Sequence, residues 1–261
     1  MILAVDVGNT HIEIGVFEKN VFVSSWRIAT GVHRTEDEVM AFIQQFLQTI
    51  DRAPTDIKDI AISSVVPTIT QIFSKLADKY FQLEPLIVGH QLELGLEIDY
   101  EPKYSVGADR LCNAVAAKTK YGFPAIVVDF GTATTLDVLG DRGEYCGGII
   151  TPGLEISAWG LYERATKLPK IPLEFPKNAI GRTTETSIQS GIMFGTVKMI
   201  DGLIELVSAE LTGSPTVIAT GGISPLLAPR SKYVEHVEPS LVLDGLMMIY
   251  HLQDNRQALR K

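Results

Sequence analysis

The sequence predicts an α/β protein built from two similar halves. The first observation is a strand that ends in a polar turn and resumes with alternating apolar residues, AVDVGNTHIEIGVF from Ala4. The second is the return of the same order in IVVDFGTATTLDVL from Ile126. The third is that strand and helix patterns alternate after both segments. We therefore expect one half over residues 1–118 and the other over residues 119–261.

Corresponding positions of the two turns carry similar residues. The matching pairs are Asp6 with Asp129, Gly8 with Gly131, and Asn9 with Thr132. An Asp-x-Gly turn alone arises easily by chance, whereas one with a matching strand before it and alternation after it is much rarer. The pattern therefore favours descent of both halves from one unit.

The first half is expected to open with three antiparallel strands. Apolar, β-branched runs separated by turn residues cover residues 1–7, 12–17 and 21–27. Thr35 and Glu38 then have the spacing of a capping box, and an apolar helical face continues to Ile50. The remaining elements are a strand in DIAISSVVP, a helix over 69–80, a strand in PLIVG and a helix over about 109–120.

The second half repeats this opening, with strands expected over 125–129, 135–139 and 145–150. Segment 168–176 is rich in proline, so we expect an extended surface loop. Segment 187–207 has a helical pattern, although its three glycines, at 191, 195 and 202, each cost about 1 kcal/mol relative to alanine. Glycines four residues apart indicate close approach of another backbone, which predicts an interface. A strand in TVIATGG and a helix from about residue 225 complete the half.

Composition excludes several classes of function. The chain has 261 residues, 46% of them hydrophobic, and a formal net charge of −8, so a basic surface for nucleic acid or anionic membrane is not expected. The first apolar run meets Asp6 too early for a signal peptide, and no apolar run approaches the roughly 20 residues that span a bilayer. Two cysteines are too few for a disulfide framework or a zinc site. We expect a cytoplasmic protein.

The two turns have the composition of phosphate-binding loops. Glycine lets a phosphate approach the backbone, whose N–H groups form an anion-binding concavity, and Asn9, Thr10 and Thr132 add side-chain donors. A carboxylate beside phosphates is repulsive unless a cation intervenes, so Asp6 and Asp129 imply a cation. The alternative is that Asp-x-Gly-Asn is simply a good turn. A third glycine turn, in ATGG, would let a base or ribose lie against the backbone, and together the three turns predict a nucleotide cleft between the halves.

Six motifs in order, DVGNT, SSVVP, VGADR, VDFGTATT, GGIITPG and ATGG, extend over nearly the whole chain. In this arrangement the sequence resembles the type III pantothenate kinases, within the superfamily of acetate and sugar kinases, actin and heat-shock chaperone ATPases. The resemblance implies two ribonuclease H-like halves in an actin-like ATPase fold. It also implies transfer of phosphate from ATP to pantothenate, giving 4′-phosphopantothenate, the first step towards coenzyme A. A homodimer is implied as well.

The segment YEPKYSVGADR is the other polar constellation, and it has two interpretations. Asp109 at a helix start is an ordinary N-cap, worth about 1 kcal/mol, and Arg110 a surface charge. Alternatively, Asp109 orients the attacking hydroxyl and takes its proton, while Arg110 binds an anionic substrate. On that interpretation the helix N-terminus should keep Asp109 ionised.

The resemblance implies a role for each matching residue. Asp109 is then the proton acceptor, ATP contacts Asp6, Val7, Gly8, Asn9, Thr10, His11, Ile12, Glu13 and Thr132, and pantothenate contacts Tyr100, Gly107, Ala108, Asp109, Arg110 and Thr184. Asp129 either coordinates Mg²⁺ together with Asp6, as the symmetry suggests, or holds a monovalent cation, K⁺ or NH₄⁺, as the resemblance implies. We expect the monovalent ion there and Mg²⁺ with the nucleotide.

His11 and Thr184 each have more than one interpretation, and two other functions compete with the kinase. His11 stands where a small amide residue is more usual, and we interpret it as a neutral packing residue. Thr184 fits a helix N-cap as well as a pantothenate contact. The competing functions are a sugar kinase or polyphosphate phosphatase of the same superfamily, and a regulatory relative without activity. Loss of a turn carboxylate or of Asp109 would favour the regulatory relative, and all three carboxylates are present.

Overall fold

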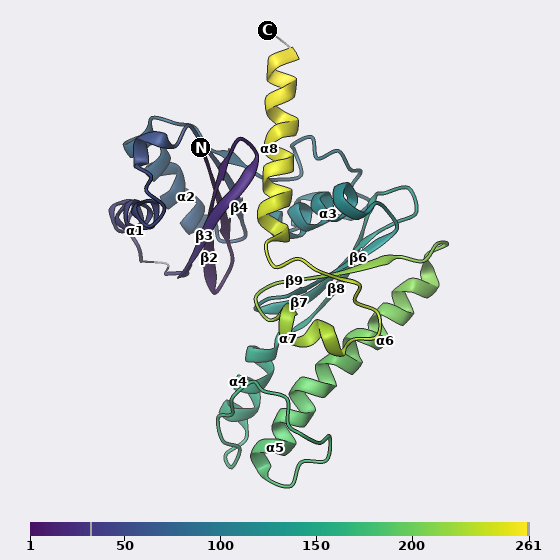
Figure 1. Cartoon of the computed structure of the whole chain (residues 1–261). Helices are drawn as coiled ribbons and strands as arrows, with labels where there is room; N and C mark the ends of the chain where they lie inside the picture. The colour runs from purple at the N-terminus through teal and green to yellow at the C-terminus, as the bar shows by residue number, and fades with distance from the viewer. Residues whose placement is uncertain (32, 260–261) are drawn as a thin grey trace. The chain divides into compact units, whose positions relative to one another are not determined.

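The computed structural model describes residues 1–31 and 33–259 and contains two compact units (Figure 1). The first unit comprises residues 1–116 together with the C-terminal helix α8 (Leu241–Leu259), and the second comprises residues 117–240. The sequence predicts a second half over residues 119–261, which includes the C-terminal helix, so the two divisions differ at this helix. Helix α8 contacts strands β1 (Ile2–Val7) and β4 (Asp59–Ser64) of the first sheet, which places it in the first unit.

The first unit is built on a five-stranded mixed sheet in the order β3-β2-β1-β4-β5. The other three strands are β2 (His11–Glu18), β3 (Val21–Ala29) and β5 (Leu86–Ile87). β1 pairs antiparallel with β2, and β2 with β3, which confirms the expected opening. β4 pairs parallel with β1 and with the short edge strand β5, so the carboxyl ends of three strands meet at one edge.

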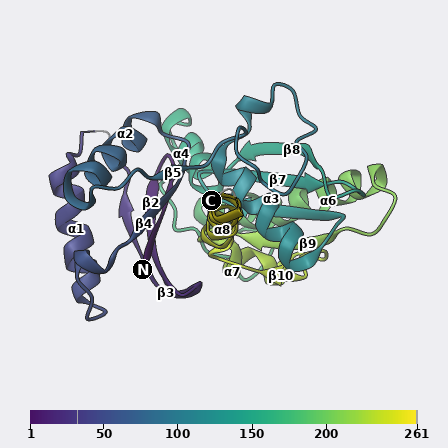
Figure 2. The ribbon, with the colours of Figure 1, turned by 90° about the horizontal axis from the view of Figure 1, so that it is seen from above.

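Helices cover both faces of this sheet, with α1 (Glu36–Gln48) and α2 (Pro67–Leu76) together on one face (Figure 2). The capping box of Thr35 and Glu38 is confirmed, since each side chain accepts a hydrogen bond from the other residue's backbone N–H. Apolar side chains from these two helices and the facing side of the sheet form one buried core.

Small residues allow α8 to approach the other face. Ala4 pairs with Gly15 on one side and Ala61 on the other, and a side chain at Gly15 would meet Leu243 of α8 at 2.8 Å. Gly245 lies so close to helix α3 (Ala108–Tyr121) that an added Cβ would overlap the Cys112 carbonyl oxygen. The strand sequence thus provides a smooth face onto which the C-terminal helix packs.

The second unit repeats the topology of the first, with sheet order β10-β9-β6-β7-β8. Its strands are β6 (Ala125–Phe130), β7 (Ala133–Leu139), β8 (Tyr145–Pro152), β9 (Thr216–Thr220) and β10 (His236–Val237). Three antiparallel strands are again followed by two parallel ones, which supports the inference of a repeated unit.

The helices of the second unit include an irregular one. They are α4 (Leu154–Arg164), α5 (Thr184–Gln189), α6 (Gly195–Glu210) and the short α7 (Ser224–Leu227). The expected helix over 187–207 begins earlier, at Thr184, and contains a π-helical segment, Ser190–Phe194, between α5 and α6. Segment 168–176 is irregular, as expected. None of the described helices has the length and apolar character needed to cross a bilayer.

Replacing Gly245 by alanine should destabilise the protein, because the added methyl group must displace the backbone of α3. We expect the free energy of unfolding to fall by about 1–3 kcal/mol, as for overpacked cores. Gly202→Ala is the matched control, since Gly202 is also helical but faces open space, and it should be neutral or stabilising by up to about 1 kcal/mol. Urea denaturation followed by circular dichroism measures both, and a Gly245→Ala protein as stable as the wild type would contradict the packing described.

Candidate active site

The turn between β1 and β2 is stabilised by its own hydrogen bonds and by hydrogen bonds from Thr30, which follows β3. The Gly8 N–H donates to the His11 carbonyl oxygen at 3.0 Å, which closes the hairpin between β1 and β2. Thr30, at the end of β3, donates from its hydroxyl to the Gly8 carbonyl oxygen at 2.7 Å and from its N–H to the Thr10 carbonyl oxygen at 2.9 Å. Thr30 is not among the residues predicted for this site, and its position directly after the third strand is its only sequence signal.

The carboxylate of Asp6 lies at the carboxyl end of β1. Asp6 is paired in register with Ser63 of the parallel strand β4, and the Ser63 hydroxyl donates to Asp6 Oδ1 at 2.8 Å. Asn9 and Thr10, beyond it, are exposed at the tip of the turn. A carboxylate held by a neighbouring strand and a glycine turn with exposed donors is the arrangement that a cation-bridged phosphate requires.

The other residues predicted to contact ATP occupy mixed positions. Val7 and Ile12 are buried in the core of the first unit, so only their backbone can face a nucleotide. The Glu13 carboxylate accepts hydrogen bonds from Ser25 at 2.9 Å and Arg27 at 3.2 Å on β3. His11 is exposed, so its interpretation as a packing residue was wrong. His11 is the first residue of β2, so it lies next to the turn and not in the buried core of the sheet.

The Gly107–Arg110 segment leads into α3, and Asp109 is not its N-cap. Helix α3 begins at Ala108, so Asp109 is its second residue and lies in the first turn, which corrects the capping interpretation. Its Oδ1 accepts a hydrogen bond from the Arg110 N–H at 2.8 Å. An added Cβ at Gly107 would overlap this carboxylate and come within 3.3 Å of Val65, so glycine is required for Asp109 to lie where it does.

Burial of Asp109 works against its charged form. It raises the pKa of the carboxyl above its ordinary value, although the N–H and the guanidinium of Arg110 oppose the rise. The helix N-terminus alone predicts a carboxylate that stays ionised, whereas desolvation has the larger effect here. A raised pKa brings a carboxylate closer to the value that suits a general base at neutral pH.

The carboxylates of the first turn and of the Gly107–Arg110 segment are gathered near one buried thiol. Cys112 follows Asp109 by one helical turn and is fully buried. Burial raises the pKa of this thiol well above its usual value, and the negative charges of Asp6 and Asp109 raise it further. The first unit therefore brings together two of the predicted site residues that are 103 positions apart in the sequence (109 − 6).

The second unit builds an analogous turn around Asp129. Asp129 is near the end of β6, in register with Thr135 of β7 and Thr220 of the parallel strand β9. Gly221, which follows Thr220, has a φ of +87°, and an added Cβ there would lie 2.7 Å from Asp129 Oδ1 and 2.6 Å from the Phe130 carbonyl oxygen. The third glycine turn therefore lies directly against the second, and two oxygens converge where only glycine fits.

The remaining predicted residues are placed as follows. Thr132 is exposed at the tip of the second turn, and Tyr100 is half-buried in the irregular segment between β5 and α3. Thr184 is exposed as the first residue of α5, and the N-cap is Thr183, whose hydroxyl accepts from the Thr186 N–H at 3.1 Å. The capping alternative for Thr184 was therefore wrong. In the described part of the chain, no cluster of three His, Cys, Asp or Glu side chains could hold a metal ion.

Two repeated sheets, each with a glycine turn and a carboxylate at its parallel edge, define the fold of actin-like ATPases and sugar kinases. Solved structures agree on this fold. A Sinorhizobium meliloti protein described as a putative 2-dehydro-3-deoxygalactonokinase matches with a TM-score of 0.58 and 12% identity over 97% of this chain and 96% of its own. A Campylobacter jejuni protein described as a putative Baf family transcriptional activator matches with a TM-score of 0.61 and 18% identity over 97% and 99%.

Sequence comparison then identifies the family. Residues 2–206 match the family model of type III pantothenate kinase. The type III pantothenate kinase of Bacillus cytotoxicus is 45% identical over 250 residues, covering 96% of this chain and 95% of the relative. That of Citrifermentans bemidjiense is 43% identical over 250 residues, covering 96% and 98%. The chain belongs to the type III pantothenate kinase family, and its reaction is the ATP-dependent phosphorylation of pantothenate in coenzyme A biosynthesis.

Proposed function

We propose that Asp109 is the general base of this reaction and takes the proton of the pantothenate hydroxyl as it attacks the γ-phosphate. The observation that carries this proposal is the position of Asp109 in the first turn of α3, where burial raises the pKa of its carboxyl. Phosphoryl transfer needs alignment and charge neutralisation more than covalent chemistry, so one oriented carboxylate suffices. The chemistry balances, because the acceptor oxygen gains the phosphoryl group and loses its proton to Asp109, while ADP leaves.

Arg110 is assigned to the other end of the acceptor. Pantothenate carries a primary hydroxyl at one end and a carboxylate at the other, and a guanidinium pairs well with a carboxylate. Tyr100, Gly107, Ala108 and Thr184 are assigned as further pantothenate contacts on the resemblance of their motifs. Gly107 has an additional role, because it leaves the space that the Asp109 carboxylate occupies.

ATP is assigned to the two turns, residues 6–13 in the first unit and Thr132 in the second. The exposed backbone and side-chain donors at Asn9 and Thr10 suit phosphate oxygens. Bound Mg²⁺ would neutralise charge on the transferring phosphate, and Asp6 is the carboxylate placed beside that turn.

Asp129 is assigned to a monovalent cation, K⁺ or NH₄⁺. The assignment is supported by two oxygens that lie close to the backbone of Gly221, Asp129 Oδ1 and the Phe130 carbonyl oxygen. One carboxylate with one backbone carbonyl oxygen is a hard, weakly charged set of donors, which suits a monovalent ion better than a dedicated divalent site. The cation would offset the charge of Asp129 beside the phosphates.

Coupled measurement of ADP release with and without pantothenate tests the function as a whole. Pantothenate-dependent release supports the kinase, whereas release with a sugar or hydrolysis of polyphosphate would favour another enzyme of the superfamily. Absence of any turnover would favour a regulatory relative.

Asp109→Asn should abolish most activity without unfolding the protein. We expect kcat to fall by about 10²–10⁴-fold, because the proton acceptor is lost while the shape is retained. In the wild type, kcat should fall as the pH drops through the raised pKa of Asp109, above the ordinary aspartate range. A group with a raised folded-state pKa destabilises the protein when ionised, so the variant should melt higher than the wild type near pH 7 and equally near pH 3.

Arg110→Ala is the comparison variant for Asp109→Asn, and its main effect should be a higher KM for pantothenate. Steady-state kinetics and melting curves at several pH values measure all of these quantities. An Asp109→Asn enzyme with wild-type kcat would show that the base is misassigned.

Activity should rise with K⁺ or NH₄⁺ and stay low in Na⁺ at equal ionic strength, because the larger ions suit the proposed oxygen site. Asp129→Ala should remove this response. Initial rates in the three chloride salts provide the measurement, with Asp141→Ala as the control, since that exposed carboxylate instead binds Thr212 and Gly213. Equal wild-type rates in all three salts would contradict the cation site.

We also propose a homodimer formed through the helices of the second unit. Helix α4 exposes Ile156, Trp159 and Tyr162, and Leu206 of α6 is 65% exposed. Gly191 and Gly195 face open space, so another backbone can approach them. Sedimentation velocity at micromolar concentration should show a dimer, and Trp159→Glu should shift it towards monomer, whereas a monomeric wild type would contradict the proposal.

A further inference from the structure

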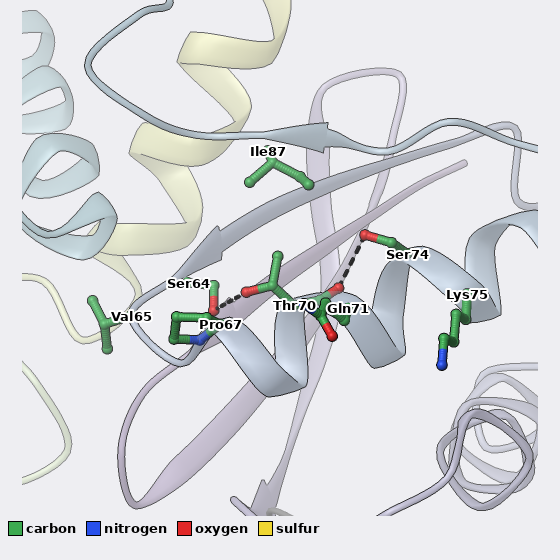
Figure 3. Close-up of a pocket in the computed structure, with 8 residues that line it drawn as sticks. All are labelled: Ser64, Val65, Pro67, Thr70, Gln71, Ser74, Lys75 and Ile87. Carbon is green, nitrogen blue, oxygen red and sulfur yellow. Dashed lines mark hydrogen bonds between the residues drawn. The ribbon is translucent and has the colours of Figure 1, made fainter. Parts of the chain in front are cut away.

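A pocket of about 560 Å³ opens within the first unit, outside the residues assigned above (Figure 3). It lies at the carboxyl ends of the parallel strands β4 and β5, beside the helix α2. Its lining residues are Ser64, Val65, Pro67, Thr70, Gln71, Ser74, Lys75 and Ile87. Ligands of open α/β sheets bind at the carboxyl ends of parallel strands, and the volume is in the range of small-molecule sites.

One wall of the pocket offers hydrogen bonds. The Thr70 hydroxyl donates to the Ser64 hydroxyl at 2.7 Å, and the Ser74 hydroxyl donates to the Thr70 carbonyl oxygen at 3.0 Å. Gln71 adds an exposed amide on the next position of the same helix. In Figure 3, Ser64 and Thr70 lie at one end of this row and Lys75 lies at the other. Polar groups of this kind orient an elongated ligand that has its own hydroxyl or amide groups.

The remaining wall is apolar. Val65 and Pro67 form it on the side of the β4–α2 connection, and Ile87, 39% exposed, forms it on the edge strand. These side chains would cover an aliphatic segment of a ligand. A lining of this mixed composition suits a ligand whose central part is aliphatic better than a ligand that is charged along its whole length.

The charge of the pocket is opposite in sign to that of the chain. None of its lining residues is acidic, although the whole chain carries a net charge of −8. Lys75 is exposed and takes part in none of the ion pairs between described residues. Helix α2 has no acidic residue in its first turn, and its N-cap residue Val66 provides no side-chain cap. Lys75 lies in the last turn of α2, at the end opposite to this N-terminus, so the lysine is the group in the pocket that would pair with an anionic ligand.

The pocket is connected to the segment that carries the proposed base. Val65 lines the pocket, and its Cγ1 lies 3.3 Å from the position that a Cβ of Gly107 would occupy. The Val65 N–H also donates to the Val7 carbonyl oxygen at 3.1 Å, just before the first phosphate turn. A ligand that presses on Val65 therefore acts on a residue packed against both proposed substrate-binding segments.

We propose that this pocket is a second binding site for a small organic anion with an aliphatic, hydrogen-bonding body, and that its occupancy alters the affinity for the acceptor. Pantothenate and its phosphorylated product both have this chemistry. The choice of these two probes rests on the proposed function, whereas the existence of the site does not. The anionic group would lie at Lys75 and the body along Thr70, Gln71 and Ile87.

Isothermal titration of the full chain with pantothenate, with the phosphorylated product and with the neutral alcohol analogue of pantothenate tests the site. Pantothenate should fill two classes of site per chain in the wild type. Lys75→Gln should weaken one class at least tenfold, and Gln71→Trp, a change at an exposed position that fills the pocket, should abolish the same class. The neutral analogue should not fill this class. Lys58→Gln, an exposed lysine at the amino end of β4, is the matched control and should leave it unchanged.

Kinetics separate this proposal from the proposed function. Lys75→Gln should keep the wild-type kcat while changing KM for pantothenate at least threefold, and melting curves should confirm that it is folded. A single class of site per chain in the wild type, or a second class that survives both pocket variants, would overturn the proposal. An absence of pantothenate-dependent ADP release would instead count against the proposed function, and the titration would still decide whether the pocket binds anions.

Discussion

The parallel pairing of β1 with β4, with Asp6 in register with Ser63, is the constraint on which the rest of the first unit depends. Because both strands point the same way, their carboxyl ends meet at one edge, and everything that follows either strand begins there. The phosphate turn follows β1, and Val65 and α2 follow β4. A shift of one residue would turn the Asp6 side chain to the opposite face and separate it from Ser63. The second unit has the same constraint, with Asp129 in register with Thr220.

Close packing positions α3 against this edge, and glycine makes it possible. Gly245 lets α8 rest against the backbone of α3, and Gly107 lets the Asp109 carboxylate fold back beside Val65. Interiors are packed too densely for such contacts to adjust to an added methyl group without cost. The position of the proposed base therefore depends on a helix more than 130 residues further along the chain (245 − 109 = 136).

Electrostatics at this edge are set by burial as much as by neighbouring charges. Asp109 lies at a helix N-terminus and beside a guanidinium, and both favour its ionised form, yet burial has the larger effect and raises its pKa. Cys112 shows the same balance, because burial and the charges of Asp6 and Asp109 keep its thiol protonated. The pocket beside α2 has the opposite character, since it is open to solvent and lined by a lysine without any carboxylate. The first unit thus contains two different environments. The one around Asp109 favours proton transfer, and the one beside α2 favours a bound anion.

The sequence by itself determined the repeated α/β plan, the strands of both openings and the Thr35–Glu38 cap, because these depend on local periodicity and short-range hydrogen bonds. Motif spacing was also enough to predict the family. Only the tertiary structure decided that α8 packs on the first sheet, that Thr30 fastens the first turn, and that Thr183 rather than Thr184 caps α5. The raised pKa of Asp109 likewise could not be predicted from the sequence, since desolvation depends on atoms brought from distant parts of the chain. Periodicity records which side of an element faces the core, but not which distant element covers it.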